Sequence, residues 1–168
     1  GPFQFPEKLI PLLTIRAIMG RTLPLYGSGE NVRDWLFVED HADALLNIVS
    51  NGIPGTTYLV GGNAERSNVA VARELCTILD RLKPTTDGSC YIDRLRFVDD
   101  RPGHDFRYAI DATETTASLG WRPKTNFSDG LERTVRWYLA NEAWWEPLAE
   151  IGETVDRIGL RRSAEASE

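Results

Sequence analysis

The segment at residues 9–19 places the strongest constraint on how this chain can fold. Six of its residues are leucine or isoleucine, and on a helix they surround most of the cylinder. Pro6 suits the first turn of such a helix, and Gly20 suits its end. The segment is shorter than a membrane span and is interrupted by Arg16. It therefore predicts a helix that is largely buried in the core of a globular domain.

Hydrophobic periodicity along the rest of the 168-residue chain predicts an α/β fold. Asp40 is suited to cap one helix, and Ser67 or Asn68 is suited to cap the next. Cys76 lies on the apolar face of that second helix, whereas Cys90 lies in a loop. The predicted elements are extended segments at 23–26, 33–38, 56–60, 95–98 and 108–110, and helices at 41–50, 68–82, 113–119 and from 128 onward.

Charge and cysteine content narrow the classes of function. A formal net charge of -6 argues against nucleic acid as a partner, because binding to a phosphate backbone needs a basic face. Two cysteines are too few for a disulfide framework, which indicates a reducing, cytoplasmic setting. The sequence shows neither a signal peptide nor a membrane span. We therefore expect no nucleic-acid partner and no membrane association.

The motifs of hydride-transfer chemistry are missing from the sequence. No Gly-x-Gly-x-x-Gly loop follows a strand, and Gly61-Gly62 fits a backbone turn better than a pyrophosphate site. No tyrosine is followed four residues later by a lysine, and the chain has three lysines in all. His41 and His104 are the only histidines, and no cysteines cluster with them, so we expect no metal site. His41 lies beside acids on a predicted helix, which favours a structural role.

The turn at residues 100–105 is the strongest candidate for ligand binding. Pro102 and Gly103 force the chain to turn between two short apolar runs, and Arg101 and His104 lie on either side of them. Guanidinium groups pair bidentately with phosphate, so the turn suits a doubly charged anion. The alternative is a solvated loop whose arginines pair with neighbouring aspartates.

Further candidates are also typical of binding groups. Lys8 and Leu9 stand at a helix N-terminus, where backbone N–H groups can hold an anion. Tyr26 could stack on a planar base, and its alternative is a core aromatic beside Pro24. Together these positions form a set of anion and ring contacts without a catalytic centre, so no catalytic residue is expected in this chain.

Two more polar residues have competing interpretations. Arg33 precedes an apolar extended segment and could reach an anion, or it could simply pair with Asp34 or Glu30. Asn68 could bond a ligand phosphate, or it could do no more than cap its helix.

Several blocks of the sequence, in this order and spacing, resemble the dTDP-glucose 4,6-dehydratases, a branch of the extended short-chain dehydrogenase/reductase family. The resemblance covers about residues 1–142. The Arg-Asp-Trp and Asp-Arg-Pro-Gly-His sequences distinguish this branch from other sugar-nucleotide epimerases and decarboxylases. The matching blocks lie at residues 1–11, 23–27, 33–41, 100–105 and 107–111.

The resemblance implies a role for each candidate. Lys8 and Leu9 would lie along the nucleotide, and Pro24 and Tyr26 would flank the thymine. Diphosphate binding would fall to two arginines, and two further residues would complete the pocket. The implied substrate-binding set is Lys8, Leu9, Pro24, Tyr26, Arg33, Asn68, Arg101 and His104.

The resemblance also implies what the chain lacks. The family oxidises C4 of the glucose with NAD⁺, eliminates water across C5–C6 and returns the hydride to C6. The NAD-binding glycines and the catalytic residues of the family precede the point where this sequence starts. We therefore expect a C-terminal fragment of a homodimeric enzyme, inactive by itself, with NAD bound by the absent half. Residues 1–145 would be its sugar-nucleotide-binding portion, and 146–168 a partly disordered tail, disordered from Arg161 onward.

The expected fold class is α/β, or α+β for the isolated chain. In the family, the strand at 56–60 and the helix at 41–50 belong to the Rossmann sheet. Without the rest of that sheet, the strand would have no sheet to join, and the inner face of the helix (Ala44, Leu45, Ile48 and Val49) would lack a surface to cover. An exposed face of this kind predicts poor solubility or a partly molten state. Two alternatives remain open at this stage: another nucleotide-sugar epimerase or decarboxylase, and a non-catalytic nucleotide-sugar binding module.

Overall fold

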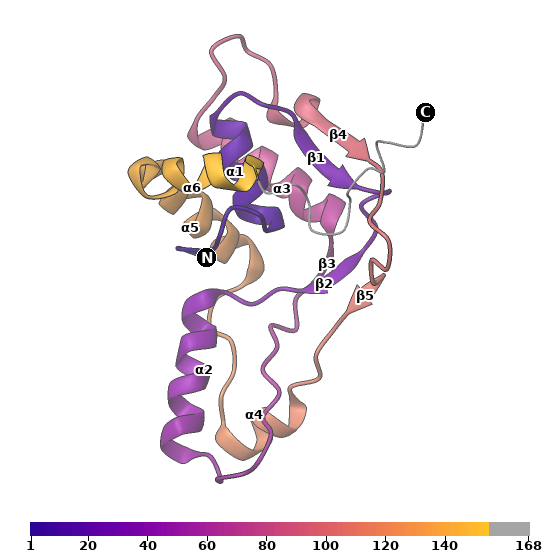
Figure 1. Ribbon diagram of the computed structural model, residues 1–168. Helices are drawn as coiled ribbons and strands as arrows, with labels where there is room; N and C mark the ends of the chain where they lie inside the picture. Colours follow the sequence, from indigo (N-terminus) through magenta and orange to yellow (C-terminus); the bar gives the residue numbers. More distant parts are fainter. Residues whose placement is uncertain (155–168) are drawn as a thin grey trace.

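The computed structural model describes residues 1–154, which form a core lobe and a projecting arm (Figure 1). The arm consists of residues 38–60 and 110–125, and the core lobe contains the remaining helices. The elements are α1 (Leu9–Ile18), β1 (Leu23–Tyr26), β2 (Val32–Asp34), α2 (Val38–Asn51), β3 (Glu65–Ser67), α3 (Asn68–Leu82), η1 (Tyr91–Arg94), β4 (Leu95–Val98), β5 (Arg107–Tyr108), α4 (Thr113–Leu119), α5 (Phe127–Ala140) and α6 (Glu142–Thr154).

The core lobe is built around α1, as its apolar sequence predicts. Leu13 of α1 is fully buried, and it belongs to one hydrophobic cluster with Leu75 and Leu79 of α3 and Val135 of α5. Gly20 follows the helix with a φ of +72°, a left-handed conformation that ends it at little steric cost. The helix at 9–19 is therefore confirmed as a buried element.

Two small sheets connect segments that lie far apart in the sequence. β1 pairs with β4 in parallel, with Leu23 opposite Leu95. In the second sheet β2 is central, antiparallel to β3 and parallel to β5. The carboxyl ends of β1 and β4 meet at one edge because the strands are parallel. The loop that leaves β4 there is the turn at residues 100–105.

The arm differs from its prediction at two points. Helix α2 begins at Val38 rather than at residue 41, and Phe37 is its N-cap residue. Asp40 is inside the helix, where its buried carboxylate accepts a hydrogen bond from the backbone N–H of Thr125 (2.8 Å). The prediction that Asp40 caps α2 is wrong, because its carboxylate binds the N–H of Thr125, in a loop far away in the sequence, instead of an N–H at the start of the helix.

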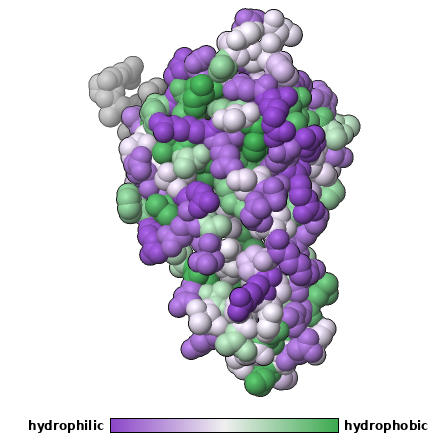
Figure 2. Space-filling model, turned by 180° about the vertical axis from the view of Figure 1, so that it is seen from behind, coloured by the Kyte–Doolittle hydropathy of each residue, from purple (hydrophilic) through white to green (hydrophobic). Residues whose placement is uncertain are grey.

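Residues 56–60 pair with no strand of the described chain, as expected for a segment whose sheet in the family lies outside it. A strand needs a hydrogen-bonded neighbour, and none lies beside this segment. On α2, Ala44 is buried and Ile48 is half-buried, but the other two residues of the predicted inner face are open: Leu45 is 49% exposed and Val49 85% exposed. Figure 2 shows apolar surface at the lower end of the molecule, the end formed by the arm.

Aromatic residues pack α6 against the rest of the core lobe. The indole Nε1 of Trp145 donates to the carbonyl of Tyr138 (2.8 Å), and Trp144 lies edge-on to Trp137 at 5.1 Å.

Helix α6 runs across residue 145, the predicted boundary between the binding portion and the tail. The disorder predicted from Arg161 onward falls outside the described residues. None of the helices within residues 1–154 is long and apolar enough to cross a membrane.

Candidate functional site

The exposed side of β1 provides an apolar and aromatic surface. Leu23 and Leu25 are buried, so Pro24 and Tyr26, two residues apart, share the opposite and half-buried face. Tyr26 lies at the carboxyl end of the strand, where its ring meets that of His104 edge-on, with centroids 6.4 Å apart. The structure therefore brings together three of the residues predicted to bind the nucleotide.

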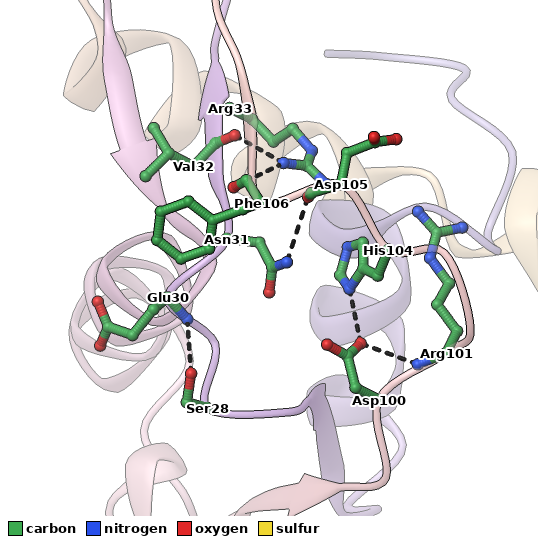
Figure 3. A network of polar contacts seen from close by, with 10 residues as sticks. All are labelled: Ser28, Glu30, Asn31, Val32, Arg33, Asp100, Arg101, His104, Asp105 and Phe106. Atoms are coloured by element: carbon green, nitrogen blue, oxygen red, sulfur yellow. Dashed lines mark hydrogen bonds and ion pairs between the residues drawn. The ribbon is translucent and has the colours of Figure 1, made fainter.

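Asp100 organises the turn that follows β4 (Figure 3). Its Oδ1 accepts from the Nδ1 of His104 (2.6 Å) and from the backbone N–H of Arg101 (2.8 Å). The bond from His104 is the main cause that lowers the pKa of Asp100 below its usual value. Gly27 permits the close approach of this turn to β1: its φ is +55°, and a Cβ there would lie 2.9 Å from Asp100 Oδ2.

The two cationic candidates of the turn differ in exposure. The side chain of His104 is only 6% exposed, and its Nδ1 is engaged by Asp100. The guanidinium of Arg101 extends away from Asp100 in Figure 3, on the exposed side of the turn. Within the described chain it makes no hydrogen bond or ion pair. The alternative of a loop whose arginines pair with its own aspartates does not apply to Arg101.

Arg33 is held by backbone rather than by acidic side chains. Its Nη2 donates to the carbonyl of Asp105 (2.9 Å), and its Nη1 donates to the carbonyl of Val32 (2.6 Å). The guanidinium also lies 4.7 Å above the ring of Tyr108. The competing expectation of a pair with Asp34 or Glu30 is wrong, because Asp34 accepts instead from the N–H groups of residues 62 and 64.

Asn68 begins α3 but does not cap it. The cap is Ser67, whose hydroxyl accepts from the backbone N–H of Ala70 (3.3 Å). The expectation that Asn68 acts by capping is therefore wrong, and its side chain makes no hydrogen bond with the described residues. Its backbone N–H donates to the carbonyl of Asn31 (3.0 Å), which places Asn68 next to the residue that precedes β2.

Lys8 and Leu9 stand apart from this group. Lys8 is the N-cap residue of α1, and its ammonium pairs with Glu7 (2.7 Å). No side-chain cap and no acidic residue occupy the first turn of α1, and because Pro11 has no N–H, only Leu9 and Ile10 keep backbone N–H groups without a helical partner there. Among residues 1–154, no hydrogen bond or ion pair connects Lys8 to Tyr26 or to the turn.

These groups can bind an anion and a ring, but they form no catalytic centre. Within residues 1–154 no cluster of His, Cys, Asp and Glu side chains is placed to hold a metal ion. A cavity of about 40 Å³ near Trp35 and Leu131 lies away from the turn and is too small for a nucleotide sugar. The residues present do not fit NAD either, because no glycine loop joins a strand to a helix here. A Cβ at Gly62 would instead lie 1.8 Å from the carbonyl oxygen of Trp35, so close backbone contact explains this glycine.

Two side chains that the sequence interpretation missed help to hold the turn. The amide of Asn31 donates to the carbonyl of Asp105 (3.2 Å). Glu65 of β3 pairs with Arg107 of β5 through two bonds of 2.7 Å. In both pairs the two partners lie far apart in the sequence, so no local pattern identifies the contacts. The burial of Asn31, which is only 7% exposed, is likewise apparent only in the structure.

Comparison with known proteins identifies the family. The family model described as GDP-mannose 4,6 dehydratase matches residues 1–134. The chain belongs to the GDP-mannose 4,6-dehydratase family. Among its relatives, the dTDP-glucose 4,6-dehydratase of Escherichia coli is 50% identical over 164 residues, which cover 95% of this chain and 45% of the relative. That of Neisseria meningitidis is 47% identical over 161 residues, 95% of this chain and 45% of the relative.

Solved structures in this family agree. The dTDP-glucose 4,6-dehydratase of Bacillus anthracis in complex with NAD superposes with a TM-score of 0.78 at 45% identity, over 88% of this chain and 44% of that one. DesIV of Streptomyces venezuelae, with NAD and TYD bound, gives the same TM-score at 43% identity, over 88% of this chain and 43% of that one. The chain thus spans a little under half the length of these relatives and matches their C-terminal part. The predicted family and the mixed α/β fold class are confirmed.

Proposed function

We propose that this chain forms the nucleotide-sugar-binding portion of a dTDP-glucose 4,6-dehydratase, which converts dTDP-glucose to dTDP-4-keto-6-deoxyglucose and water. One observation carries the proposal: the turn at 100–105 lies at the carboxyl end of β1, where its His104 meets the ring of Tyr26 and the Arg101 guanidinium is exposed. A planar ring surface next to an available guanidinium suits a pyrimidine nucleotide with its phosphates.

Each candidate then has a proposed task. Pro24 and Tyr26 contact the thymine, and Arg101 pairs with the diphosphate. His104, whose Nδ1 is engaged by Asp100, turns Nε2 toward the sugar-phosphate. Arg33 holds the turn by donating to the carbonyl of Asp105, and its remaining N–H groups contact the ligand. Asn68, Lys8 and Leu9 supply further polar contacts at the ends of α3 and α1.

The oxidation and elimination steps are proposed to depend on the part of the relatives that this chain does not match. NAD would be the hydride acceptor and is proposed to bind there, since the described residues of this chain include no glycine loop for its pyrophosphate. The open faces of α2 and of residues 56–60 are proposed to pack against that part, which would cover Val49. The complete enzyme is proposed to be a cytoplasmic homodimer. Size-exclusion chromatography with light scattering tests the dimer, and fractionation of cells tests the location.

Calorimetric titration with dTDP-glucose tests the binding role. Arg101→Ala should weaken binding on the order of 10- to 100-fold, because a charged hydrogen bond to phosphate is lost. Arg122→Ala, which removes an exposed arginine from the arm, is the matched control and should bind as the unchanged chain does. Equal weakening by both substitutions would contradict a specific diphosphate site at the turn.

Turnover tests the reaction itself and needs a longer chain that includes the remainder of the relatives. That protein should convert dTDP-glucose in preference to UDP-glucose. Preferred turnover of UDP-glucose would favour an epimerase or decarboxylase and contradict the proposed substrate. Binding of dTDP-glucose by the present chain without turnover by the longer one would support a non-catalytic binding module.

A further inference from the structure

We infer that Asn31 is a positioning residue, which fixes the separation between the amino end of α3 and the turn at residues 100–105. This inference rests on the proposed diphosphate site, because the two segments carry Asn68 on one side and Arg101 and His104 on the other. Nothing in the sequence pattern marks Asn31: it lies in the short connection between Gly29 and β2.

The geometry gives Asn31 two contacts in opposite directions. Its backbone carbonyl accepts from the backbone N–H of Asn68 (3.0 Å). Its side-chain amide donates to the carbonyl of Asp105 (3.2 Å), the bond drawn in Figure 3. The residue is 7% exposed. A single buried residue therefore contacts both segments that would meet the ligand.

The contacts around Asn31 run in the same two directions. The carbonyl of Gly29 accepts from the N–H of Val69 (2.9 Å), on the α3 side. The N–H of Val32 donates to the carbonyl of Phe106 (2.7 Å), on the turn side. These are backbone bonds that any residue could make. The amide of Asn31 is the one contact of this connection to Asp105 that depends on which side chain is present.

The carbonyl of Asp105 receives two side-chain donors, the amide of Asn31 and the guanidinium of Arg33 (2.9 Å). A carbonyl oxygen has two lone pairs, so both are used. If the turn shifts, both donors lose their acceptor together. Since Asp105 directly follows His104, the position of His104 and Arg101 relative to β1 depends on this anchored carbonyl.

The chemistry of the anchor requires a donor. An aspartate at position 31 has nearly the same shape, but its carboxylate cannot donate to a carbonyl and it adds negative charge beside the proposed anion site. Loss of the amide should let the turn move, and misplacement of binding groups by about 1 Å is costly when several must act on one ligand. The base surface on β1 does not depend on this contact.

The test compares three substitutions at position 31 with Asn51→Ala, an amide on the far end of α2 that pairs with Asn47. Hydrogen exchange is measured without ligand for peptides covering 99–107 and for peptides covering 71–79 of α3. Dissociation constants are measured for dTDP and for thymidine. Exchange reports the position of the turn whether or not the chain binds nucleotide.

For Asn31→Ala we expect faster exchange at 99–107 with unchanged exchange at 71–79, and dTDP binding weakened roughly 5- to 10-fold while thymidine binding changes little. Asn31→Asp should weaken dTDP further, and Asn31→Gln, which keeps the donor, should recover part of the loss. On an Arg101→Ala background, Asn31→Ala should have a smaller effect, because the arginine that it positions is gone.

Unchanged exchange at 99–107 in Asn31→Ala would overturn the positioning role. Faster exchange there with unchanged dTDP affinity would overturn the connection to binding. If the unsubstituted chain binds no dTDP, the proposed function fails for this chain by itself, while the exchange result still decides whether Asn31 holds the turn.

Discussion

Helices α2 and α3 have similar amphipathic patterns but opposite surroundings. On α3, the apolar residues Leu75 and Leu79 are fully buried in the core lobe. On α2, Leu46 is 67% exposed and Val49 is 85% exposed, while the buried Asp40 faces the rest of the chain. Helix α2 thus buries Asp40 and Ala44 but leaves several of its large apolar side chains exposed.

The comparison shows what an amphipathic pattern encodes. It specifies that a face is to be buried, but it does not specify which partner buries it. For α3 the partners α1 and α5 are in this chain. For α2 the chain offers polar contacts: Asp40 accepts from the backbone N–H of Thr125, and Glu39 accepts from Arg133. Core lobe and arm should therefore respond very differently to the same substitutions.

The largest contrast is expected for a matched pair of leucine deletions. Leu75→Ala in the core lobe should lower the free energy of unfolding by about 2–5 kcal/mol, because it leaves a cavity among buried side chains. Leu46→Ala on the arm should change it by less than about 0.5 kcal/mol, since little area is uncovered. Urea unfolding followed by circular dichroism measures both. Similar losses from the two substitutions would mean that the arm is buried in solution.

A smaller loss is expected where the arm is attached. Asp40→Ala should cost about 1–3 kcal/mol, because it leaves the N–H of Thr125 without its buried acceptor. Asp43→Ala breaks only the exposed pair with Lys124 and should cost less than about 1 kcal/mol. Hydrogen exchange of α2 should accelerate in the first variant and not in the second. Equal acceleration would contradict a specific anchor at Asp40.

Alkaline pH should destabilise the core lobe. Burial raises the pKa of Cys76 from 9.0 to about 12 and that of Tyr138 from 10.0 to about 12. The folded state keeps these protons to higher pH than the unfolded state does, so stability is intact below pH 9 and falls as pH rises towards 12. Each group contributes a slope of up to about 1.4 kcal/mol per pH unit within its window. Urea unfolding at a series of pH values measures the slope, and Tyr138→Phe should reduce it above pH 10.

The smallest effect on stability is expected from polar substitution of the arm, although its effect on solubility should be visible. Val49→Ser should leave the free energy of unfolding nearly unchanged and raise the concentration at which the chain aggregates, because an exposed apolar face is reduced. Static light scattering against concentration measures this. A sharp thermal transition with no aggregation in the unsubstituted chain would contradict the expected poor solubility.

The sequence predicts the elements whose partners are local or are themselves strongly apolar. The buried helix at 9–19 and the strand at 95–98 are confirmed, and of the two residues suggested as the cap of α3 the structure has Ser67. Residues 56–60 have no partner strand within the described residues, which agrees with the expectation that they find no sheet to join here. For the site, the proximity of Tyr26 and His104 agrees with the predicted set. The carbonyl contacts of Arg33 and Asn31 depend on a long-range meeting of segments that no local pattern encodes.

The pairing of β1 with β4 also has a kinetic consequence. Leu23 lies opposite Leu95, so this sheet forms only when two segments separated by β2, α2, β3 and α3 come together. Contacts between distant segments form late and slowly compared with helices. The turn at 100–105 reaches Tyr26 only once that closure is complete. A ligand that contacts both should therefore slow the unfolding rate of this chain and leave its refolding rate almost unchanged.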